Sequence, residues 1–274
     1  MTPVAPRLKW HMLRQRKADP PFLRTNLVAA LRAGAACEVD IVISADGHAL
    51  CLHDRTLDRE TNGHGRVADA TRAAIEQLRQ RGADGAVLDS APLFIDELAA
   101  TVCNIGVAAP GVVQLDVKAP ARAFTAAALA NLRAALGRNT DAYIASAYEW
   151  PAVQLLVDAL PGLHAGFDPL AFYPRSFALD AAAFRAIAAR TLTTAPRAAI
   201  YYLEAKLVLA ALACDVDLVH AVTRGGAQVD AWTIDADRPQ LQDVLRQLID
   251  VGVQQITSND PAALAPIVNA IMTS

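Results

Sequence analysis

The sequence predicts a (β/α)₈ barrel. Short apolar runs rich in β-branched residues alternate with Ala- and Leu-rich runs of helical spacing, an alternation typical of parallel α/β folds. The chain has 274 residues, a usual length for a barrel of about eight such strand–helix units. A doubly wound open sheet is the alternative that the same alternation permits. Because no linker, tandem repeat or low-complexity tract divides the chain, we expect residues 1–274 to form one barrel domain.

The strands are predicted from β-branched and aromatic residues bounded by Gly, Pro or Asp. The turn at 45–48 (ADGH) joins 37–44 to 49–53 as a hairpin, so one strand is additional to the alternating eight. In chain order the predicted strands are 7–10, 37–44, 49–53, 111–118, 141–146, 163–167, 198–202, 228–234 and 254–257.

The helices are predicted from apolar residues that recur every three or four positions. Gly34 ends the first helix, Pro92 opens the third, and Pro151 lies near the first turn of the fifth. In chain order they are 23–33, 71–81, 92–104, 120–136, 149–160, 180–190, 206–213, 217–224, 238–249 and 261–272.

Composition and charge exclude several classes of protein. The net charge is −3 and the pI is about 6.1, so we expect no nucleic-acid partner, which needs a basic face. No apolar run is long enough for stable membrane insertion, and the first ten residues do not have the form of a signal peptide. The four cysteines are widely spaced, which predicts reduced thiols and a cytoplasmic protein. The oligomeric state is left open.

Two carboxylates lie two residues apart on the second predicted strand. Glu38 and Asp40 point to the same face, since side chains alternate along a strand. The flanking residues Cys37, Val39 and Ile41 are apolar and suit the helix-packed face. The two carboxylates therefore face the barrel interior, where they repel unless they are protonated or bound to a cation.

A second charged pair repeats this pattern on the strand at 111–118. Asp116 and Lys118 alternate with the apolar Leu115 and Val117. Three inward carboxylates beside an ammonium group are costly for a core and natural for a site that binds a metal ion and a phosphate. Carboxylate ligands suit one divalent cation, either Mg²⁺ or Ca²⁺.

The segment 37–71 resembles the signature of the glycerophosphodiester phosphodiesterase family. It carries in order E-x-D, a D-G turn, H-D, L-D-R-x-T and N-G-x-G-x-V. Three later segments are similar to other parts of the family's barrel, namely QLDVKAP (114–120), VDAWTID (229–235) and ITSNDP (256–261). The resemblance implies a (β/α)₈ barrel with an insertion at about 48–70.

The resemblance also implies an activity and its residues. It implies hydrolysis of a small glycerophosphodiester to glycerol 3-phosphate and an alcohol, with His11 and His53 as the catalytic histidines. The implied cation ligands are Glu38, Asp40 and Asp116, the last standing where the family usually has Glu, and Lys118 faces the phosphate. One histidine would activate the attacking oxygen, and the other would protonate the leaving alkoxide.

The chain departs from the family pattern at two places. It reads HML at 11–13, where the family has H-R-G, and RTN at 24–26, where the family has E-N-T or E-N-S. Met12 therefore replaces a phosphate-binding arginine, and we expect Arg24 to reach the phosphate from another side. The alternative guanidinium groups are Arg14 and Arg16.

Other polar residues are weaker candidates. Trp232 is expected to form a wall of the substrate pocket, either by stacking on the substrate or by closing the barrel. Glu149, Tyr202 and Glu204 lie near predicted strand ends, where they contact the alcohol or are simply solvated. The remaining histidines, which match no ligand spacing, are expected to be structural or exposed: His48, His64, His164 and His220.

Two alternative functions remain open at this point. The substitutions at Met12 and Arg24 are compatible with a related phosphodiesterase of altered chemistry, such as a lysophospholipase D-like or a cyclising enzyme. A catalytically weak phosphodiester-binding protein would keep the barrel and the metal site. Neither the alcohol of the substrate nor the choice between Mg²⁺ and Ca²⁺ follows from the sequence.

Overall fold

Eight parallel strands form a closed ring in the computed structural model, which describes residues 4–106 and 111–273. The ring closes because β1 pairs with β9 on one side and with β2 on the other. One additional strand, β3, lies outside the ring and pairs antiparallel with the carboxyl-terminal part of β2. This closure confirms the barrel and excludes the doubly wound open sheet. The strands are β1 (Arg7–Trp10), β2 (Ala36–Ile43), β3 (Ala49–Cys51), β4 (Val113–Val117), β5 (Tyr143–Ala147), β6 (His164–Phe167), β7 (Ile200–Glu204), β8 (Gln228–Trp232) and β9 (Gln255–Ser258).

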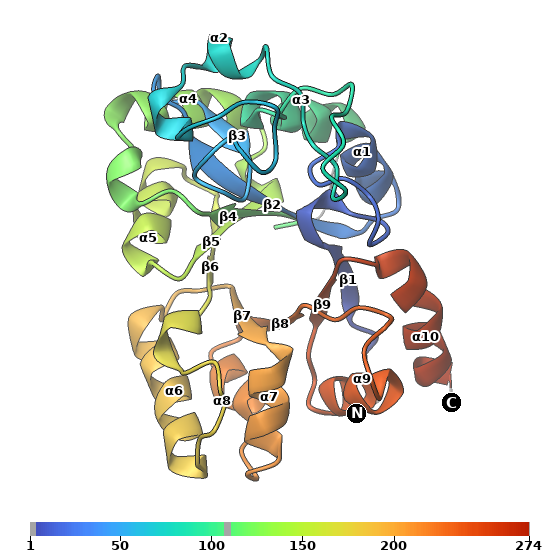
Figure 1. Cartoon of the computed structure of the whole chain (residues 1–274). Helices are drawn as coiled ribbons and strands as arrows, with labels where there is room; N and C mark the ends of the chain where they lie inside the picture. Colours follow the sequence, from blue (N-terminus) through green and yellow to red (C-terminus); the bar gives the residue numbers. More distant parts are fainter. Residues whose placement is uncertain (1–3, 107–110, 274) are drawn as a thin grey trace.

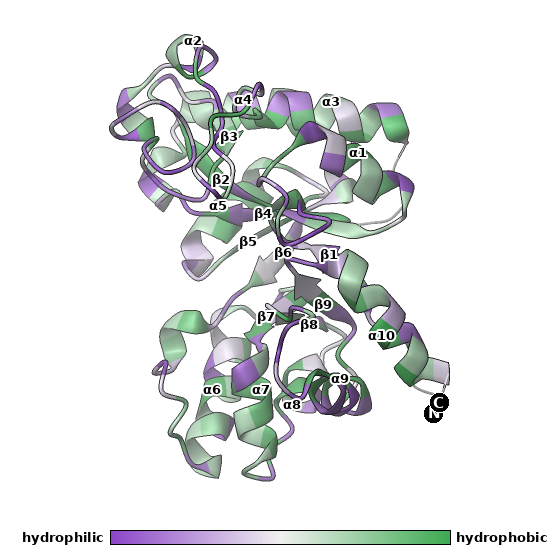
Figure 2. Ribbon diagram, turned by 45° about the vertical axis from the view of Figure 1, so that its right-hand side comes forward, coloured by the Kyte–Doolittle hydropathy of each residue, from purple (hydrophilic) through white to green (hydrophobic). Residues whose placement is uncertain are grey.

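The helices lie around the outside of this ring (Figure 1). Several of them, α9 among others, carry both hydrophilic and hydrophobic residues, as their mixed colours in Figure 2 show. In α9 the buried side chains are all aliphatic, the pattern expected of an amphipathic helix on a core. The helices are α1 (Arg24–Arg32), α2 (Arg72–Ile75), α3 (Ile95–Ile105), α4 (Ala126–Leu136), α5 (Trp150–Ala159), α6 (Ala181–Thr194), α7 (Ala205–Leu212), α8 (Leu218–Thr223), α9 (Leu241–Asp250) and α10 (Pro261–Thr273).

The inside of the ring is polar, unlike the layer between strands and helices. Branched apolar residues usually fill the interior of such barrels. Here the buried interior includes Lys9, Gln114, Asp230 and Gln255, each at most 6% exposed. These side chains are bonded to one another, which offsets the cost of burying them.

The chain between β3 and α3 packs over the β2–β3 hairpin. It contributes Leu57, Val67 and Ile75 to a separate apolar cluster with Leu50 and Phe94. Isolated backbone bridges, such as the one between Thr56 and Arg66, hold the segment together. This segment carries His53 to the carboxyl ends of the strands, where a barrel binds its ligands.

Several predicted helices differ in extent. The one predicted at 180–190 continues to Thr194, and the one predicted at 238–249 begins at Leu241. The helix predicted at 71–81 ends at Ile75, because the backbones of Gln80 and Arg81 instead bridge to neighbouring loop segments. The one predicted at 92–104 begins at Ile95, since the Leu93 carbonyl accepts a hydrogen bond from the backbone of β3. The one predicted at 120–136 is a short 3₁₀ turn followed by α4, which begins after Thr125. The Thr125 hydroxyl caps α4 by accepting a hydrogen bond from a backbone N–H of its first turn.

The cysteines are free thiols, as predicted. Cys37 and Cys51 are buried, and burial raises the pKa of the Cys37 thiol to about 12. No helix in the described parts of the chain is both long and apolar enough to cross a bilayer.

Candidate active site

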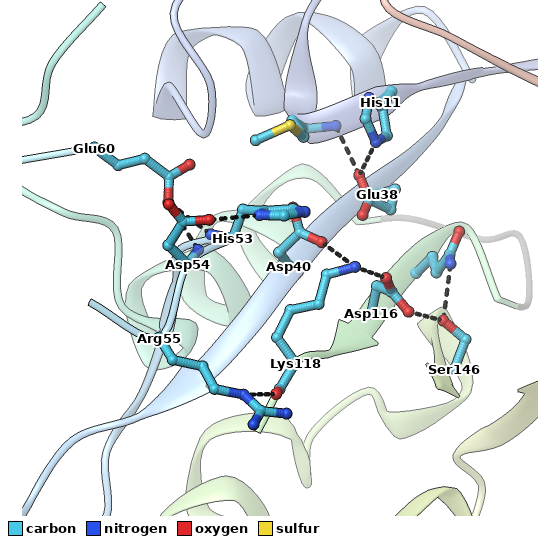
Figure 3. A network of polar contacts seen from close by, with 12 residues as sticks. His11, Glu38, Asp40, His53, Asp54, Arg55, Glu60, Asp116, Lys118 and Ser146 are labelled. Atoms are coloured by element: carbon cyan, nitrogen blue, oxygen red, sulfur yellow. Dashed lines mark hydrogen bonds and ion pairs between the residues drawn. The ribbon is translucent and has the colours of Figure 1, made fainter. Parts of the chain in front are cut away.

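The three predicted cation ligands converge at the carboxyl ends of β2 and β4. These strands are parallel neighbours, and their register pairs Asp40 with Asp116, so the two carboxylates lie side by side. Glu38 points the same way from one pleat earlier (Figure 3). One oxygen from each of the three residues lies within 4.8 Å of the others. The structure therefore brings together the cluster expected from the sequence.

Burial makes this cluster costly without a cation. Glu38 is 4% exposed and Asp40 is fully buried. Burial raises the pKa of Glu38, with a smaller contribution from the charge of Asp116. Burial and then the charge of Glu38 raise the pKa of Asp40 to about 8. Neither oxygen of Asp40 has a hydrogen-bond partner among the described residues, although Oδ1 forms an ion pair with Lys118. Buried carboxylate oxygens that lack hydrogen bonds, as in Asp40, are the ligands that a hard divalent cation takes, so the cluster fits Mg²⁺ or Ca²⁺.

Lys118 lies between two of the carboxylates. Its Nζ atom is 3.0 Å from Oδ1 of Asp40 and also donates to Oδ2 of Asp116 (Figure 3). Burial opposes the charge of this ammonium, but the attraction of the three carboxylates outweighs burial and raises its pKa. Lys118 therefore carries a positive charge at the cavity at neutral pH.

His11 follows β1 and enters the site from the side opposite Lys118. Its ring is held by Asn259, which is itself oriented by Asp235. The backbone N–H and the Nδ2 atom of Asn259 donate hydrogen bonds to the Asp235 carboxylate at 2.9 and 3.1 Å. The Oδ1 atom of Asn259 therefore faces His11 and accepts from Nδ1–H at 2.7 Å. This leaves Nε2 free to accept a proton, 3.9 Å from Oε2 of Glu38. Burial lowers the pKa of His11, which favours the neutral ring.

His53 lies on the solvent side, in the segment that follows β3. Nδ1 of its ring is 2.8 Å from Oδ1 of Asp54, and its side chain is 45% exposed. Arg59 pairs with Asp54 through two hydrogen bonds and holds the pKa of that carboxyl well below its usual range. Glu60 fixes the backbone by accepting hydrogen bonds from the N–H groups of His53 and Asp54. The ring is thus held at Nδ1, and Nε2 is available to the cavity.

A cavity of about 330 Å³ joins these groups. Both histidines, Glu38, Asp116 and Lys118 line it. The opposite wall comes from the later strands and their loops and consists of Tyr148, Asp168, Leu170, Arg175, Tyr202, Trp232 and Thr233, with Lys9, Gln114 and Thr257 at the floor.

Trp232 lines this cavity, and its contact with a substrate stays a prediction. The guanidinium of Arg175 lies over its ring at 6.0 Å and also pairs with Glu204. Glu204 does not line the cavity itself, but it contacts Arg175, which does. Tyr202 is one of the residues that line the cavity. Glu149 immediately precedes α5 and does not line the cavity.

Arg24 does not line the cavity. It begins α1, and its Nη2 atom is 2.8 Å from Oε1 of Glu97 on α3, so contact with a phosphate would require this ion pair to break. The phosphate role of Arg24 stays a prediction. Met12 packs its side chain into the apolar core and places no polar group at the site except its backbone N–H. Arg14 lies closer, with Nη1 3.4 Å from Oδ1 of Asn259 and a buried Nε that has no partner among the described residues.

Several residues of the site were missed by sequence reasoning. Asp168 directly follows β6, and a polar residue directly after a predicted strand is a sequence feature that could have identified it as a site residue. Burial, with a contribution from the charge of Asp116, raises the pKa of Asp168 to about 8. Asn259 lies in the quoted segment 256–261, yet nothing in the spacing relates it to His11, which is 248 residues away. Ser146 contacts Asp116 across the β4–β5 pair, a relationship that depends on register.

Comparison with known proteins finds a protein family that matches most of the chain. Residues 26–263 match the Glycerophosphoryl diester phosphodiesterase family. A glycerophosphodiester phosphodiesterase of Caldanaerobacter subterraneus is 44% identical over 67 residues, which are 23% of this chain and 28% of that protein. The bovine glycerophosphodiester phosphodiesterase 1 is 42% identical over 60 residues, 20% of this chain and 17% of the relative. The matched part thus spans less than a third of the length of these curated relatives.

Solved structures share the fold over nearly the whole chain. A phosphodiesterase of Oleispira antarctica, solved in complex with the product sn-glycerol-3-phosphate, superposes with a TM-score of 0.72 at 19% identity and covers 97% of both chains. A glycerophosphodiester phosphodiesterase of Agrobacterium tumefaciens gives a TM-score of 0.64 at 20% identity, covering 95% of this chain and 99% of the other. At these identities the likeness establishes the barrel fold.

Proposed function

Because the chain belongs to the glycerophosphoryl diester phosphodiesterase family, we propose that it hydrolyses glycerophosphodiesters to glycerol 3-phosphate and an alcohol. One observation carries the proposal: a single cavity is lined by His11, His53, Lys118 and two members of the carboxylate cluster, Glu38 and Asp116. Hydrolysis of a phosphodiester needs positive charge on the phosphoryl oxygens and two proton transfers, and these side chains supply both.

The proposed cation site consists of Glu38, Asp40 and Asp116. A divalent cation bound there would supply positive charge to the phosphoryl oxygens and lower the cost of the attacking oxygen's negative charge. Lys118 adds a fixed positive charge from within the same cluster and orients a phosphoryl oxygen by donating a hydrogen bond. Arg24 is proposed as a further phosphate contact, provided that it leaves Glu97.

The proposed acid–base pair is His11 and His53. His11 is neutral at neutral pH because burial lowers its pKa, and Asn259 keeps the proton on Nδ1. Its Nε2 atom therefore accepts the proton of the attacking water. His53 is the more exposed ring, on the side from which an alcohol leaves, and it donates a proton from Nε2 while Asp54 holds Nδ1.

The wall formed by Trp232 and Arg175 is proposed to contact the organic part of the substrate. The indole ring offers an apolar surface, and its Nε1–H is buried without a partner among the described residues. A hydroxyl of the substrate would satisfy this donor.

The test is an assay of glycerol 3-phosphate release from a panel of glycerophosphodiesters, with Mg²⁺, Ca²⁺ or EDTA. We expect cation-dependent release that EDTA abolishes. His11→Ala and His53→Ala should each lower kcat by about 10²–10⁴ while the calorimetric affinity for the cation changes little. Turnover like that of the wild type in either variant removes that histidine from the mechanism.

The same panel separates the alternatives. Release of lysophosphatidic acid or of a cyclic phosphate, in place of glycerol 3-phosphate, would indicate altered chemistry. Tight binding of the diesters without turnover in any cation would indicate a binding protein.

A further inference from the structure

A line of buried polar side chains runs inside the barrel from Lys9 to Asp116. The Nζ atom of Lys9 donates to Oε1 of Gln114, and Nε2 of Gln114 donates to Oγ of Ser146 at 2.8 Å. Ser146 donates in turn to Oδ1 of Asp116 at 2.8 Å (Figure 3). Lys9, Gln114 and Ser146 are 2%, 6% and 0% exposed, so solvent does not compete with these bonds.

The chemistry of the two ends fixes the direction of every bond in this line. An ammonium group only donates, so Gln114 must turn its carbonyl oxygen toward Lys9 and its amide hydrogens toward Ser146. Ser146 already accepts from Gln114 and has one hydrogen, which therefore goes to Asp116. An ionised carboxylate only accepts, so no other arrangement satisfies all four groups.

Lys9 is itself held in place by residues of the neighbouring strands. Its Nζ atom is 3.0 Å from Oδ2 of Asp230 and lies 4.3 Å from the centre of the Tyr202 ring. Asp230 also accepts hydrogen bonds from Gln255 at 2.7 Å and Thr257 at 2.6 Å. The donor end of the line is thus anchored to three strands of the ring, and it cannot reorient without breaking buried bonds.

We propose that Lys9 and Gln114 are positioning residues that, through Ser146, orient the Asp116 carboxylate for cation binding. This inference rests on the proposed function. Asp116 is the least buried of the three proposed ligands, so the surrounding core restrains its carboxylate the least. Ser146 holds its Oδ1 atom while Lys118 contacts Oδ2, so the plane of the carboxylate is set before a cation arrives. Groups that orient cation ligands typically contribute about 10–100-fold to affinity.

Two substitutions break the line at different points. Ser146→Ala removes the donor to Asp116. Gln114→Glu keeps the size of the side chain but accepts at both oxygens, so the Ser146 hydrogen turns away from Asp116. The added negative charge alone would strengthen cation binding, whereas the reversed hydrogen bond weakens it. The sign of the change therefore distinguishes positioning from simple electrostatics.

The experiment is a calorimetric titration of the whole protein with Ca²⁺. We expect Ser146→Ala and Gln114→Glu each to weaken binding about 10–100-fold. The double variant should bind no more weakly than the weaker single variant, because both changes remove the same hydrogen bond. Thr191→Val and Gln80→Glu are matched controls, since they alter a buried hydroxyl and a buried amide away from the site. Both should bind like the wild type.

The outcomes separate the two proposals. Unchanged affinity in Ser146→Ala, or losses that multiply in the double variant, overturns the inference and leaves the proposed function standing. Absence of binding of Ca²⁺, Mg²⁺ and Mn²⁺ by the wild-type protein overturns the proposed cation chemistry, and the inference falls with it.

Discussion

The backbone N–H of Met12 donates a 2.7 Å hydrogen bond to Oε2 of Glu38. Met12 adopts a left-handed conformation, with φ 52° and ψ 33°, in the turn that follows β1. This unusual backbone conformation directs the N–H into the site while the Met12 side chain packs into the core. At this position the backbone touches the site and the side chain does not.

Met12→Ala should therefore separate stability from cation binding. The free energy of unfolding in urea should fall by about 2–5 kcal/mol, as for other buried methionines cut to alanine. The Ca²⁺ dissociation constant should stay within about twofold, because the hydrogen bond to Glu38 comes from the backbone. Glu38→Gln is the contrasting variant and should weaken binding at least about tenfold. A loss of affinity in Met12→Ala as large as that in Glu38→Gln would contradict this account.

Asn259→Ala should disable His11 without disturbing the cation ligands. The substitution removes the acceptor that keeps the proton on Nδ1, so the ring samples the wrong tautomer and orientation. We expect kcat to fall by about 10² or more, with little change in the Ca²⁺ affinity. Asn131→Ala is the control, since Asn131 on α4 donates to a backbone carbonyl away from the site. Equal kcat values in the two variants would show that Asn259 does not position His11.

The stability of the protein in EDTA should fall as the pH rises from about 4 to about 8. Burial raises the pKa of Asp168 in the folded state to about 8, from an ordinary value of 3.8. The folded state therefore holds more protons in this window, and stability declines with pH. Asp168→Asn removes this contribution and should make the decline shallower. Asp89→Asn, which alters an exposed carboxylate, should leave the slope unchanged. Urea unfolding at several pH values provides the measurement, and a decline equally steep in Asp168→Asn would refute the assignment.

Arg24→Gln tests the phosphate contact predicted from the sequence. If Arg24 leaves Glu97 to bind the phosphate, its loss should lower kcat/KM by about 10². Glu97→Gln frees the guanidinium and should then lower KM, because no ion pair has to break. A kcat/KM within about twofold of the wild type in both variants would restrict Arg24 to its contact with Glu97, where an exposed pair contributes about 1 kcal/mol or less.

Much of the site was predictable from the sequence because it depends on the period of a strand. Two-residue spacing places Glu38 and Asp40 on one face of β2, and it places Lys118, directly after β4, on the same side as Asp116. Apolar neighbours identify that face as the interior. The alternation of strand and helix patterns likewise predicts the barrel, because parallel strands require helical crossovers.

The rest was decided by the tertiary structure, because it depends on contacts between distant segments. Closure of the ring brings Asn259 after β9 beside His11 after β1, and no local pattern encodes that contact. The same holds for Arg24, whose charge the sequence shows but whose partner on α3 is set by how two helices pack. The contacts that link Lys9 to Asp116 depend on how β1, β4 and β5 lie in the ring. Local periodicity thus determined which side chains face inward, and packing determined which of them meet.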